Sequence, residues 1–388
     1  MKSPIVIIGG GFGGVYTTKR LLKAGFPVTL ISESNFFTFT PLLHELATGG
    51  LTSDDVTFEY SSFFHHKQFQ FIRGHVDKID MKAHKILVDD TNVSFQNLVI
   101  ATGSTTQFYD IKGTEYCHTL KTVEDALRLK RHLIELAQGT NQNVQVNVIG
   151  AGPTGVELIL EIDSFMKDIQ KHNGNVAYHL RLINAGETVL APFSAPIQQY
   201  TQYILEKRGV EVIHRAIAKE LTPTQVKTSA GTFNSNATIM TAGVMPRTKC
   251  LPSQTVDKHK YINVNDHLQV KGYKSIFALG DIIAINNRPV PKLAQTAVAQ
   301  ADIVAKNIIR RHQQRPLLTY TIKLKGSLVS LGTHRGAGTV FGITIKGFFA
   351  WWLWRTVYLF KTPGPSNKLR VAFSWTIGLF TGKDLSER

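Results

Sequence analysis

Two glycine-rich clusters, each lying between an apolar run and a helical pattern, constrain the fold of this chain more than any other feature. The clusters are Gly9-Gly10-Gly11-Phe12-Gly13-Gly14 and Gly150-Ala151-Gly152-Pro153-Thr154-Gly155. In a β-α-β unit the first glycine permits a tight turn, the second lets the backbone approach a pyrophosphate, and the last lets helix and strand pack closely. The pyrophosphate lies at a helix N-terminus, where N–H groups and the helix dipole favour an anion. The sequence therefore predicts two dinucleotide-binding sites.

Apolar runs and helical patterns alternate around both clusters. Residues 4–8 and 28–31 predict strands that flank a helix ending near residue 24. Residues 144–149 and 179–183 repeat this pattern around a helix that ends near residue 169, and another helix is expected over residues 123–137. Such alternation is typical of parallel sheets covered by helices. The predicted fold class is α/β, with two Rossmann-like dinucleotide-binding domains followed by a C-terminal amphipathic helical region.

The acidic residue that commonly ends the second strand and binds the adenosine ribose is displaced in both units. In the first unit Ser32 occupies this position and Glu33 follows, and either side chain can reach the ribose hydroxyls. In the second unit the position is Asn184, a neutral amide that neither favours nor repels a 2′-phosphate. No Arg or Lys follows Asn184 closely, so the sequence favours NADH only weakly and leaves NADPH possible.

Cysteine content and charge narrow the class of protein. The chain has 388 residues, of which 43% are hydrophobic, and its two cysteines are Cys117 and Cys250. Two distant cysteines form no disulfide framework and no metal-ligand spacing, which fits a reducing compartment. A strand-like run begins near residue 4, so no targeting segment is expected.

Residues 301–388 contain 14 Lys or Arg and three acidic residues, which gives +11 of the total net charge of +16.

The C-terminal segments indicate where this positive charge acts. All four tryptophans lie among the last 40 residues, at 351, 352, 354 and 375, and we expect them at a membrane surface, because tryptophan is enriched at membrane interfaces. The apolar run 348–360 is shorter than the ~20 residues that cross a bilayer, and Arg355 interrupts it. After Pro363-Gly364-Pro365, the apolar side chains from Leu369 to Phe380 fall on one helical face. We expect two amphipathic helices that lie on an anionic membrane; a buried helix pair or a dimer interface is the alternative, and no nucleic-acid-binding module is recognisable.

Several short motifs accompany the two glycine clusters, namely Phe39-Thr40-Pro41-Leu42-Leu43, Leu46-Ala47-Thr48-Gly49-Gly50-Leu51, Ala101-Thr102-Gly103, Leu120 to Ala126, Gly155-Val156-Glu157, Thr241-Ala242-Gly243-Val244, Ala278-Leu279-Gly280-Asp281 and Ala294-Gln295-Thr296-Ala297. In these motifs, and over essentially its whole length, the chain resembles the type II NADH:quinone oxidoreductases, within the two-dinucleotide-binding flavoproteins. The C-terminal Trp-rich pair of segments completes the resemblance.

The resemblance implies a role for each matching residue. Gly9, Gly11, Phe12, Gly13, Gly14, Ser32, Glu33, Thr40, Pro41, Leu42, Ala101, Thr102, Gly103, Gly280, Asp281, Ala294 and Gln295 are expected to contact FAD. Gly150, Gly152, Pro153, Thr154, Gly155, Glu157, Asn184 and Gly243 are expected to contact the nicotinamide nucleotide. The resemblance places Glu157 near the nicotinamide and flavin, although it could also complement its helix N-terminus. Gln295 matches a glutamine near the quinone ring, although it could cap its helix; the motif's second glutamine maps to Ala299, beside Gln300.

The implied domains are an FAD domain of residues 1–112 and 250–315, a nucleotide domain of residues 113–249, and a C-terminal hairpin with anchoring helices in residues 316–388. The implied activity is hydride transfer from NADH to FAD and electron transfer to a quinone, without proton pumping, with Glu157 and Gln295 as catalytic residues. We expect a peripheral protein on the cytoplasmic face of the inner (plasma) membrane, possible as a homodimer, with no metal. A sulfide:quinone oxidoreductase, which needs two cysteines near the flavin, and a low-turnover flavin sensor are the alternatives.

Overall fold

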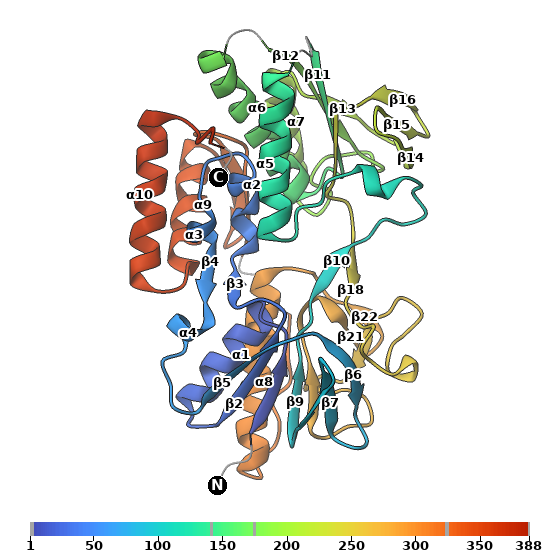
Figure 1. The fold of residues 1–388 in the computed structure, drawn as a ribbon, viewed down its shortest axis with the longest axis vertical. Coiled ribbons are helices and arrows are strands. Elements are labelled where there is room, and N and C mark those ends of the chain that lie inside the picture. Colours follow the sequence, from blue (N-terminus) through green and yellow to red (C-terminus); the bar gives the residue numbers. More distant parts are fainter. Residues whose placement is uncertain (1–3, 140–142, 174–175, 323–325, 387–388) are drawn as a thin grey trace. The chain divides into compact units, whose positions relative to one another are not determined.

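The computed structural model describes residues 4–139, 143–173, 176–322 and 326–386. The chain divides into two compact units, each built around a parallel sheet (Figure 1). Unit 1 comprises Met1–Phe37, Phe58–Thr105 and Val244–Leu324. Unit 2 comprises Thr38–Thr57, Thr106–Gly243 and Lys325–Arg388. Each unit therefore collects segments that are far apart in the sequence.

The main sheet of unit 1 has five parallel strands in the order β20-β9-β1-β2-β5. The strands are β1 (Ile5–Ile8), β2 (Val28–Ser32), β5 (Phe69–Arg73), β9 (Asn97–Ile100) and β20 (Ile276–Ala278). All four residues of β1 are buried, as expected for a central parallel strand with both faces covered. Helices α1 (Phe12–Lys23) and α8 (Ala294–His312) pack against each other, and Arg20 Nε lies 2.7 Å from Asp302 Oδ1 across this contact.

Smaller elements complete unit 1. They are β3 (Phe36–Thr38), β4 (Thr57–Glu59), α4 (Tyr60–Phe63), β6 (Val76–Asp80), β7 (Lys85–Val88), β8 (Thr91–Ser94), β10 (Ser104–Thr106), β18 (Val244–Pro246), η3 (Ser253–Thr255), β19 (Ile262–Val264), η4 (Gly280–Ile282), β21 (Ile283–Ile285) and β22 (Arg288–Pro289). Strands β6, β7 and β8 form an antiparallel sheet. The chain passes from one unit to the other within β3, β4 and β10 and immediately before β18.

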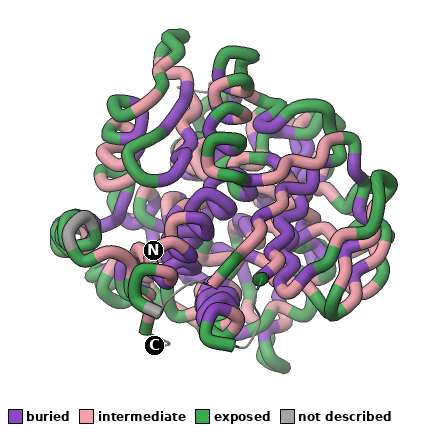
Figure 2. The backbone as a smooth tube through the Cα atoms, turned by 90° about the horizontal axis from the view of Figure 1, so that it is seen from above, coloured by how far each residue is buried: buried purple, intermediate pink, exposed green. Residues whose placement is uncertain are grey.

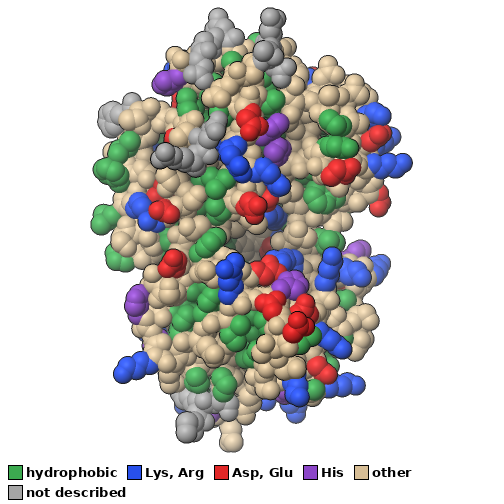
Figure 3. All heavy atoms as spheres, in the orientation of Figure 1, with side chains coloured by type: hydrophobic (Ala, Val, Ile, Leu, Met, Phe, Trp, Pro, Cys, Tyr) green, Lys and Arg blue, Asp and Glu red, His purple; other side chains and the backbone are tan. Residues whose placement is uncertain are grey.

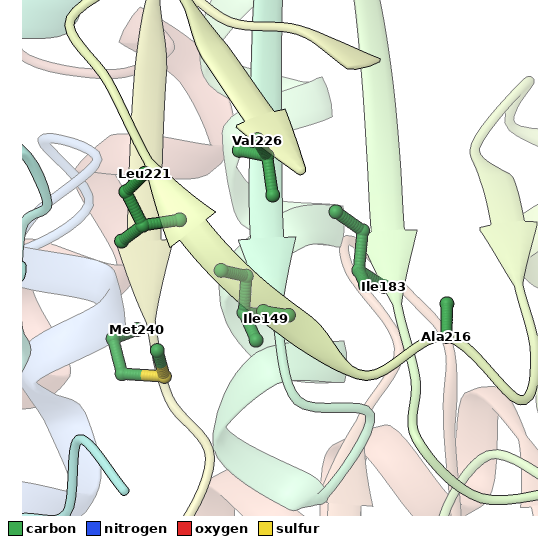
Figure 4. Packing of buried hydrophobic residues seen from close by; sticks show 7 residues of the cluster. Ile149, Ile183, Ala216, Leu221, Val226 and Met240 are labelled. Atoms are coloured by element: carbon green, nitrogen blue, oxygen red, sulfur yellow. The ribbon is translucent and has the colours of Figure 1, made fainter. Parts of the chain in front are cut away.

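Unit 2 has a second parallel sheet, in the order β13-β12-β11-β17. Its strands are β11 (Asn143–Ile149), β12 (Ala177–Ile183), β13 (Glu211–Ile213) and β17 (Ala237–Met240). Helices α5 (Val123–Gln138), α6 (Pro153–Asn173) and α7 (Ala195–Lys207), the turn η2 (Thr114–Tyr116) and the antiparallel strands β14 (Ala218–Leu221), β15 (Gln225–Thr228) and β16 (Gly231–Asn234) surround it. Within unit 2, one core cluster packs the parallel sheet against the antiparallel strands β14 and β15. Its members include Ile149, Ile183, Ala216, Leu221, Val226 and Met240 (Figure 4).

Two further segments belong to unit 2. The first contains η1 (Thr40–Leu42), α2 (Leu43–Leu46) and α3 (Ser53–Val56). The second contains an antiparallel sheet of β23 (Gly326–Ser330), β24 (Gly336–Val340) and β25 (Ile343–Gly347), then α9 (Phe348–Lys361) and α10 (Pro365–Thr381). Helix α2 packs on α5 and α6, and α10 packs on α3 and α9. In Figure 2 the buried stretches follow the strands and inner helices, whereas the loops are mostly exposed.

The predicted α/β fold class with two Rossmann-like units is confirmed. The predicted strands and helices of both β-α-β units are present, although α6 continues to residue 173, beyond the predicted end near residue 169. Gly364 precedes α10 and Pro365 lies in its first turn, so the predicted break separates the two C-terminal helices. The side chains of residues 379 and 380, including Phe380, lie outside the described part. Among the described residues, no helix is both long and apolar enough to cross a membrane.

Candidate functional site

The first glycine cluster forms the turn from β1 into α1. Gly9 has φ +102°, and a Cβ atom there would lie 2.2 Å from the Ala101 carbonyl oxygen. A Cβ atom at Gly14 would lie 1.8 Å from the Gly9 carbonyl oxygen. A Cβ atom at Gly11, in contrast, would meet no protein atom within 4 Å, so the space beside this glycine is open. Gly11 is also the N-cap of α1 and has no side-chain cap, so the turn leaves room for an anionic ligand at a helix N-terminus.

The second glycine cluster repeats this arrangement between β11 and α6. Gly150 has φ +113°, and a Cβ atom there would lie 2.7 Å from the Ala242 nitrogen. A Cβ atom at Gly155 would lie 1.8 Å from the Gly150 carbonyl oxygen, whereas Gly152 has no neighbour within 4 Å. Pro153 begins α6 and Thr154 follows it. In both clusters the outer glycines permit backbone contact and the middle glycine borders open space, and this arrangement fits a pyrophosphate at each turn.

Gly243 lies in the loop after β17, next to Ala242, which is the neighbour of Gly150 in the second turn. It follows β17 with φ +73°, and a Cβ atom there would lie 2.4 Å from the Tyr109 hydroxyl oxygen. The positive φ and the close aromatic ring together require glycine at this position. Sequence reasoning placed Gly243 near the nucleotide but did not predict that Tyr109 lies against it.

The end of β2 carries the two candidate ribose residues of unit 1. Glu33 is held by two side chains: Arg247 Nη2 lies 2.8 Å from both carboxylate oxygens, and His75 Nδ1 lies 2.8 Å from Oε1. Partial burial acts to raise the pKa of Glu33, but the hydrogen bonds from Arg247 and His75 outweigh it and lower the pKa. Ser32 lies next to Tyr60, whose hydroxyl donates to the Gly10 carbonyl oxygen at 2.8 Å. Burial raises the pKa of Tyr60 to about 12.

Two more predicted segments lie near this first turn. The Ala101 nitrogen donates to the Ile8 carbonyl oxygen, and the Thr102 hydroxyl donates to the Arg247 carbonyl oxygen at 2.6 Å. Gly103, with φ +69°, accepts a hydrogen bond from the Arg247 nitrogen through its carbonyl oxygen. The Ser104 hydroxyl donates to Asp281 Oδ2 at 2.6 Å. Unit 1 therefore brings the β9 and η4 motifs beside the glycine turn.

Helix α8 contributes two glutamines with different positions. Gln295 is the second residue of α8, after Ala294, and is half-buried. Gln300 is fully buried, and its Oε1 accepts a hydrogen bond of 2.7 Å from the Gly280 nitrogen. Its Nε2 has no hydrogen-bond partner among the described residues. The family motif has its second glutamine at the position of Ala299. Gln300, the next residue, therefore binds the backbone of the turn that precedes Asp281.

Asn184, the candidate ribose residue of unit 2, is buried and engaged within its own loop. Its Nδ2 donates to the carbonyl oxygens of Gly186 and Thr188 at 3.2 and 3.0 Å, and its Oδ1 accepts from the Gly186 nitrogen. Only 9% of the residue is exposed. These bonds occupy both ends of the amide, as is typical of an asparagine that shapes a loop, and the predicted ribose role of Asn184 stays a prediction.

Glu157 lies in the first turns of α6 and is also buried, with 9% exposure. Its Oε1 accepts a hydrogen bond of 3.0 Å from the Ser330 nitrogen on β23. Burial raises the pKa of Glu157 to about 8, although the hydrogen bond from Ser330 acts in the opposite direction. A carboxyl group with this pKa is mostly protonated at neutral pH, so it can donate as well as accept a hydrogen bond.

Glu157 belongs to a buried polar cluster in unit 2 that sequence reasoning did not predict. Its members are His44 and Glu45 on α2, Glu157 and Glu161 on α6, Arg355 on α9, and Lys383 after α10. Lys383 pairs with Glu161 and also donates to Thr48 Oγ1 at 3.1 Å. Trp375 Nε1 donates to Glu45 Oε2 at 2.6 Å.

The pKa values in this buried polar cluster are shifted in different directions. Burial acts to raise the pKa of Glu161, but the charge and the hydrogen bond of Lys383 outweigh it and lower the pKa. Burial raises the pKa of Glu45, although Arg355 acts against this. Burial lowers the pKa of His44 to about 4, so this imidazole is neutral at physiological pH. The buried polar cluster therefore contains the ion pair of Lys383 and Glu161, a neutral His44, and two carboxyl groups, those of Glu45 and Glu157, whose pKa burial raises.

The remaining predicted residues, Thr40, Pro41 and Leu42, form η1 and lead into α2. They belong to unit 2, as do residues 150–155, Glu157, Asn184 and Gly243. The other predicted residues belong to unit 1. Among the described residues, no group of three His, Cys, Asp or Glu side chains could hold a metal ion.

Comparison with known proteins identifies the family. Residues 3–301 match the family described as "Pyridine nucleotide-disulphide oxidoreductase", and residues 324–384 match the "NDH2 C-terminal domain". The "Demethylphylloquinone reductase NdbB" of Synechocystis is 28% identical, with 96% of this chain and 95% of that protein covered. The "Type II NADH:quinone oxidoreductase Ndh" of Mycobacterium tuberculosis is 26% identical, with 96% of this chain and 87% of that protein covered.

Solved structures agree on the fold. NDH2 from Plasmodium falciparum, solved in complex with NADH, matches with a TM-score of 0.92 at 19% identity, and 100% of both chains is covered. The sulfide:quinone oxidoreductase of Aquifex aeolicus matches with a TM-score of 0.79 at 20% identity, with 98% of this chain and 96% of that chain covered. The chain therefore belongs to the pyridine nucleotide-disulphide oxidoreductase family, it carries an NDH2 C-terminal domain, and its predicted resemblance to the type II NADH:quinone oxidoreductases is confirmed.

Proposed function

We propose that this protein oxidises NADH and reduces a quinone, with FAD as its resident cofactor and without proton pumping. The observation that carries the proposal is the duplicated turn geometry. In two separate parallel sheets, the outer glycines permit backbone contact and the middle glycine, Gly11 or Gly152, borders open space at a helix N-terminus. An enzyme that binds two dinucleotides needs both turns, whereas a protein that binds one needs only one.

Unit 1 is the proposed FAD domain. The N-terminus of α1 would hold the pyrophosphate, Ser32 and Glu33 would face the adenosine ribose, and Asp281 would accept from the ribityl hydroxyls. FAD, when bound, accepts a hydride from a nicotinamide and passes electrons to a quinone. The pairing of Glu33 with Arg247 and His75 fixes its carboxylate, and the hydrogen bond from Ser104 does the same for Asp281.

Unit 2 supplies the proposed nucleotide site and a proton-carrying group. The N-terminus of α6 would hold the NADH pyrophosphate beside Gly152. Glu157, whose pKa burial raises to about 8, holds a proton at neutral pH and can release it to a reduced quinone or position the substrate. Gln295, which belongs to unit 1, is the proposed amide contact of the quinone ring.

The C-terminal helices are the proposed contact with an anionic membrane. Exposed apolar side chains on α9 and α10 include Phe348, Phe349, Trp352, Phe360, Leu369 and Phe373, each at least half exposed. In Figure 3, hydrophobic side chains line the edge of the protein that α10 occupies in Figure 1. The structure corrects one expectation, because Trp351, Trp354 and Trp375 are buried within unit 2 and only Trp352 faces outward. Phenylalanine and leucine therefore replace tryptophan as the main proposed membrane contacts.

The proposed location is the cytoplasmic face of the inner (plasma) membrane, as a peripheral protein. Basic residues next to the apolar face support attraction to anionic lipid, since Lys368 lies over the exposed Phe360 ring and Lys361 over the Tyr358 ring. A homodimer formed through the same face is the alternative use of this surface, and flotation with liposomes separates the two.

Sulfide oxidation is not favoured. Cys117 and Cys250 are free and half-buried, and burial raises the pKa of both thiols, that of Cys117 to about 11. A thiol with a raised pKa is a poor nucleophile at neutral pH.

The test is steady-state reduction of a short-chain quinone by the purified protein in phospholipid, with NADH, NADPH or sulfide as donor. Rapid turnover with NADH and none with sulfide is expected. Turnover with sulfide, or a flavin that NADH reduces but quinone reoxidises only slowly, would replace the proposal with one of its two alternatives.

A further inference from the structure

We propose that Glu187, oriented by Arg215, is the carboxylate that reads the adenosine ribose of the nucleotide and makes the protein select NADH over NADPH. The proposal rests on the proposed NADH site in unit 2. It replaces Asn184, the residue at the usual position, by a residue three places later in the same loop.

The loop after β12 is folded so that Asn184 faces inward. The two carbonyl oxygens that its amide nitrogen contacts, those of Gly186 and Thr188, lie on either side of Glu187. The short ring of hydrogen bonds closes the loop, and the Glu187 side chain projects outward with 75% exposure. The asparagine therefore shapes the loop, and the carboxylate at its tip is left available to a ligand.

This loop lies against the glycine turn of the nucleotide site. The Leu190 nitrogen donates to the Ala151 carbonyl oxygen at 2.8 Å, which joins the loop directly to the turn between β11 and α6. In a Rossmann unit the adenosine ribose lies beside the pyrophosphate turn at the end of the second strand. Glu187 is thus on the loop that borders the ribose position.

Arg215 reaches the same loop from the end of β13. Its nitrogen donates to the Gly186 carbonyl oxygen at 3.0 Å, and its Nη2 donates to Glu187 Oε1 at 2.9 Å. The Ala216 nitrogen in turn donates to the Asn184 carbonyl oxygen. Backbone hydrogen bonds on both sides of Arg215 therefore fix the base of this side chain, although its guanidinium is 75% exposed.

The ion pair with Arg215 uses Oε1 of Glu187 and leaves Oε2 available to a ligand. Among the described residues, Arg215 contacts Oε1 of Glu187, and Oε2 accepts no hydrogen bond. A ribose 2′-hydroxyl can donate to such an oxygen, whereas a 2′-phosphate would meet a negative charge. Arg215 fixes the direction of the carboxylate and is a positioning residue.

The opposite assignment uses the same two residues. If Arg215 instead bound a 2′-phosphate, the protein would use NADPH at least as well as NADH, because an arginine near the ribose can accommodate that phosphate. Glu187 would then only neutralise the arginine. Kinetics with both nucleotides separates the two assignments.

The test compares wild type with Glu187→Gln, Arg215→Gln and a control, Glu135→Gln. Glu135 is a 68% exposed residue of α5 that pairs with His132, so its variant removes an equivalent surface charge elsewhere. The measured quantity is kcat/KM for NADH and for NADPH with one quinone. We expect wild type to prefer NADH and Glu187→Gln to lower the NADH/NADPH ratio by roughly 10-fold or more, since a charge-assisted hydrogen bond is lost. Arg215→Gln should lower kcat/KM for NADH, and Glu135→Gln should change nothing.

Binding measured without turnover makes failure of this inference distinct from failure of the proposed function. By calorimetry, Glu187→Gln should weaken ADP-ribose and strengthen 2′-phospho-ADP-ribose. Two results would overturn the inference. The first is an NADH/NADPH ratio of kcat/KM in Glu187→Gln that stays within twofold of wild type. The second is a wild-type protein that prefers NADPH, together with an Arg215→Gln variant that loses activity with NADPH only. If wild type binds ADP-ribose but reduces no quinone, the proposed function fails while the ribose assignment stands.

Discussion

Replacing Glu157 with glutamine should stabilise the protein more and more as the pH rises. Burial raises the pKa of Glu157 from the ordinary 4.5 to about 8, so the folded protein holds a proton that the unfolded chain releases. Between these two pKa values the stability of wild type therefore falls as the pH rises, and above pH 8 the loss is complete. Glutamine cannot ionise, and its amide oxygen can still accept the hydrogen bond from the Ser330 nitrogen.

The size of the effect follows from the pKa shift. Each pH unit inside the window changes the stability difference by about 1.4 kcal/mol, so between pH 6 and pH 8 Glu157→Gln should gain about 2 to 3 kcal/mol over wild type. The other groups of the buried polar cluster are present in both proteins and largely cancel in the comparison. For a unit of about 220 residues, this gain corresponds to roughly 5–10 °C in the unfolding midpoint.

Tryptophan fluorescence provides the assay, because all four tryptophans lie on α9 and α10 and report the unfolding of unit 2. Thermal midpoints of wild type, Glu157→Gln and the exposed control Glu135→Gln would be recorded at pH 6, 7 and 8. The control should follow wild type at every pH. A constant difference between Glu157→Gln and wild type from pH 6 to pH 8 would refute the raised pKa and with it the proton-carrying role of Glu157.

Three other changes have clear expected outcomes. Gly11→Val should fold, because nothing lies within 4 Å of that position, but should purify colourless since the side chain enters the pyrophosphate space; a yellow, fully loaded protein would contradict this. Lys383→Met leaves buried Glu161 without its cation and should cost about 3–5 kcal/mol in urea denaturation at pH 7. This cost should shrink toward pH 4, because without Lys383 burial raises the pKa of Glu161 and the variant can protonate this carboxyl. Lys383→Arg should retain most of the stability; equal costs at both pH values would argue against the ion pair. The double variant Trp352→Glu with Phe373→Glu removes two exposed apolar side chains and should no longer float with anionic liposomes, whereas high salt should only weaken wild-type binding; unchanged flotation would place the membrane contact elsewhere.

The secondary structure of the two β-α-β units could be predicted because it depends on short-range patterns. The buried run Ile5–Ile8, for example, is continuous in apolar residues, as is typical of a parallel strand covered on both faces. The three-glycine spacing likewise reports a local backbone geometry. Gly9 and Gly14 lie five residues apart, and the close contact between them is formed within one turn.

Much of the site depends on contacts between distant segments, and no local pattern reports them. Arg247 reaches Glu33 across 214 positions of sequence, and Lys383 reaches Glu161 across 222. Arg215 was missed for the same reason, because it follows a different strand and meets the Asn184 loop only when β12 and β13 pair. The tryptophans were assigned to the membrane by residue type, but packing of α9 and α10 within unit 2 buries three of them.

The most direct test of the proposed function separates its two half-reactions without air. Purified protein would be mixed with one equivalent of NADH while the absorbance of the oxidised flavin is followed, and a short-chain quinone would then be added. We expect rapid loss of the flavin absorbance with NADH and its full return with quinone, each at a rate no slower than steady-state turnover. A flavin that NADH leaves oxidised, or that stays reduced after quinone is added, would contradict the assignment of this protein as an NADH:quinone oxidoreductase.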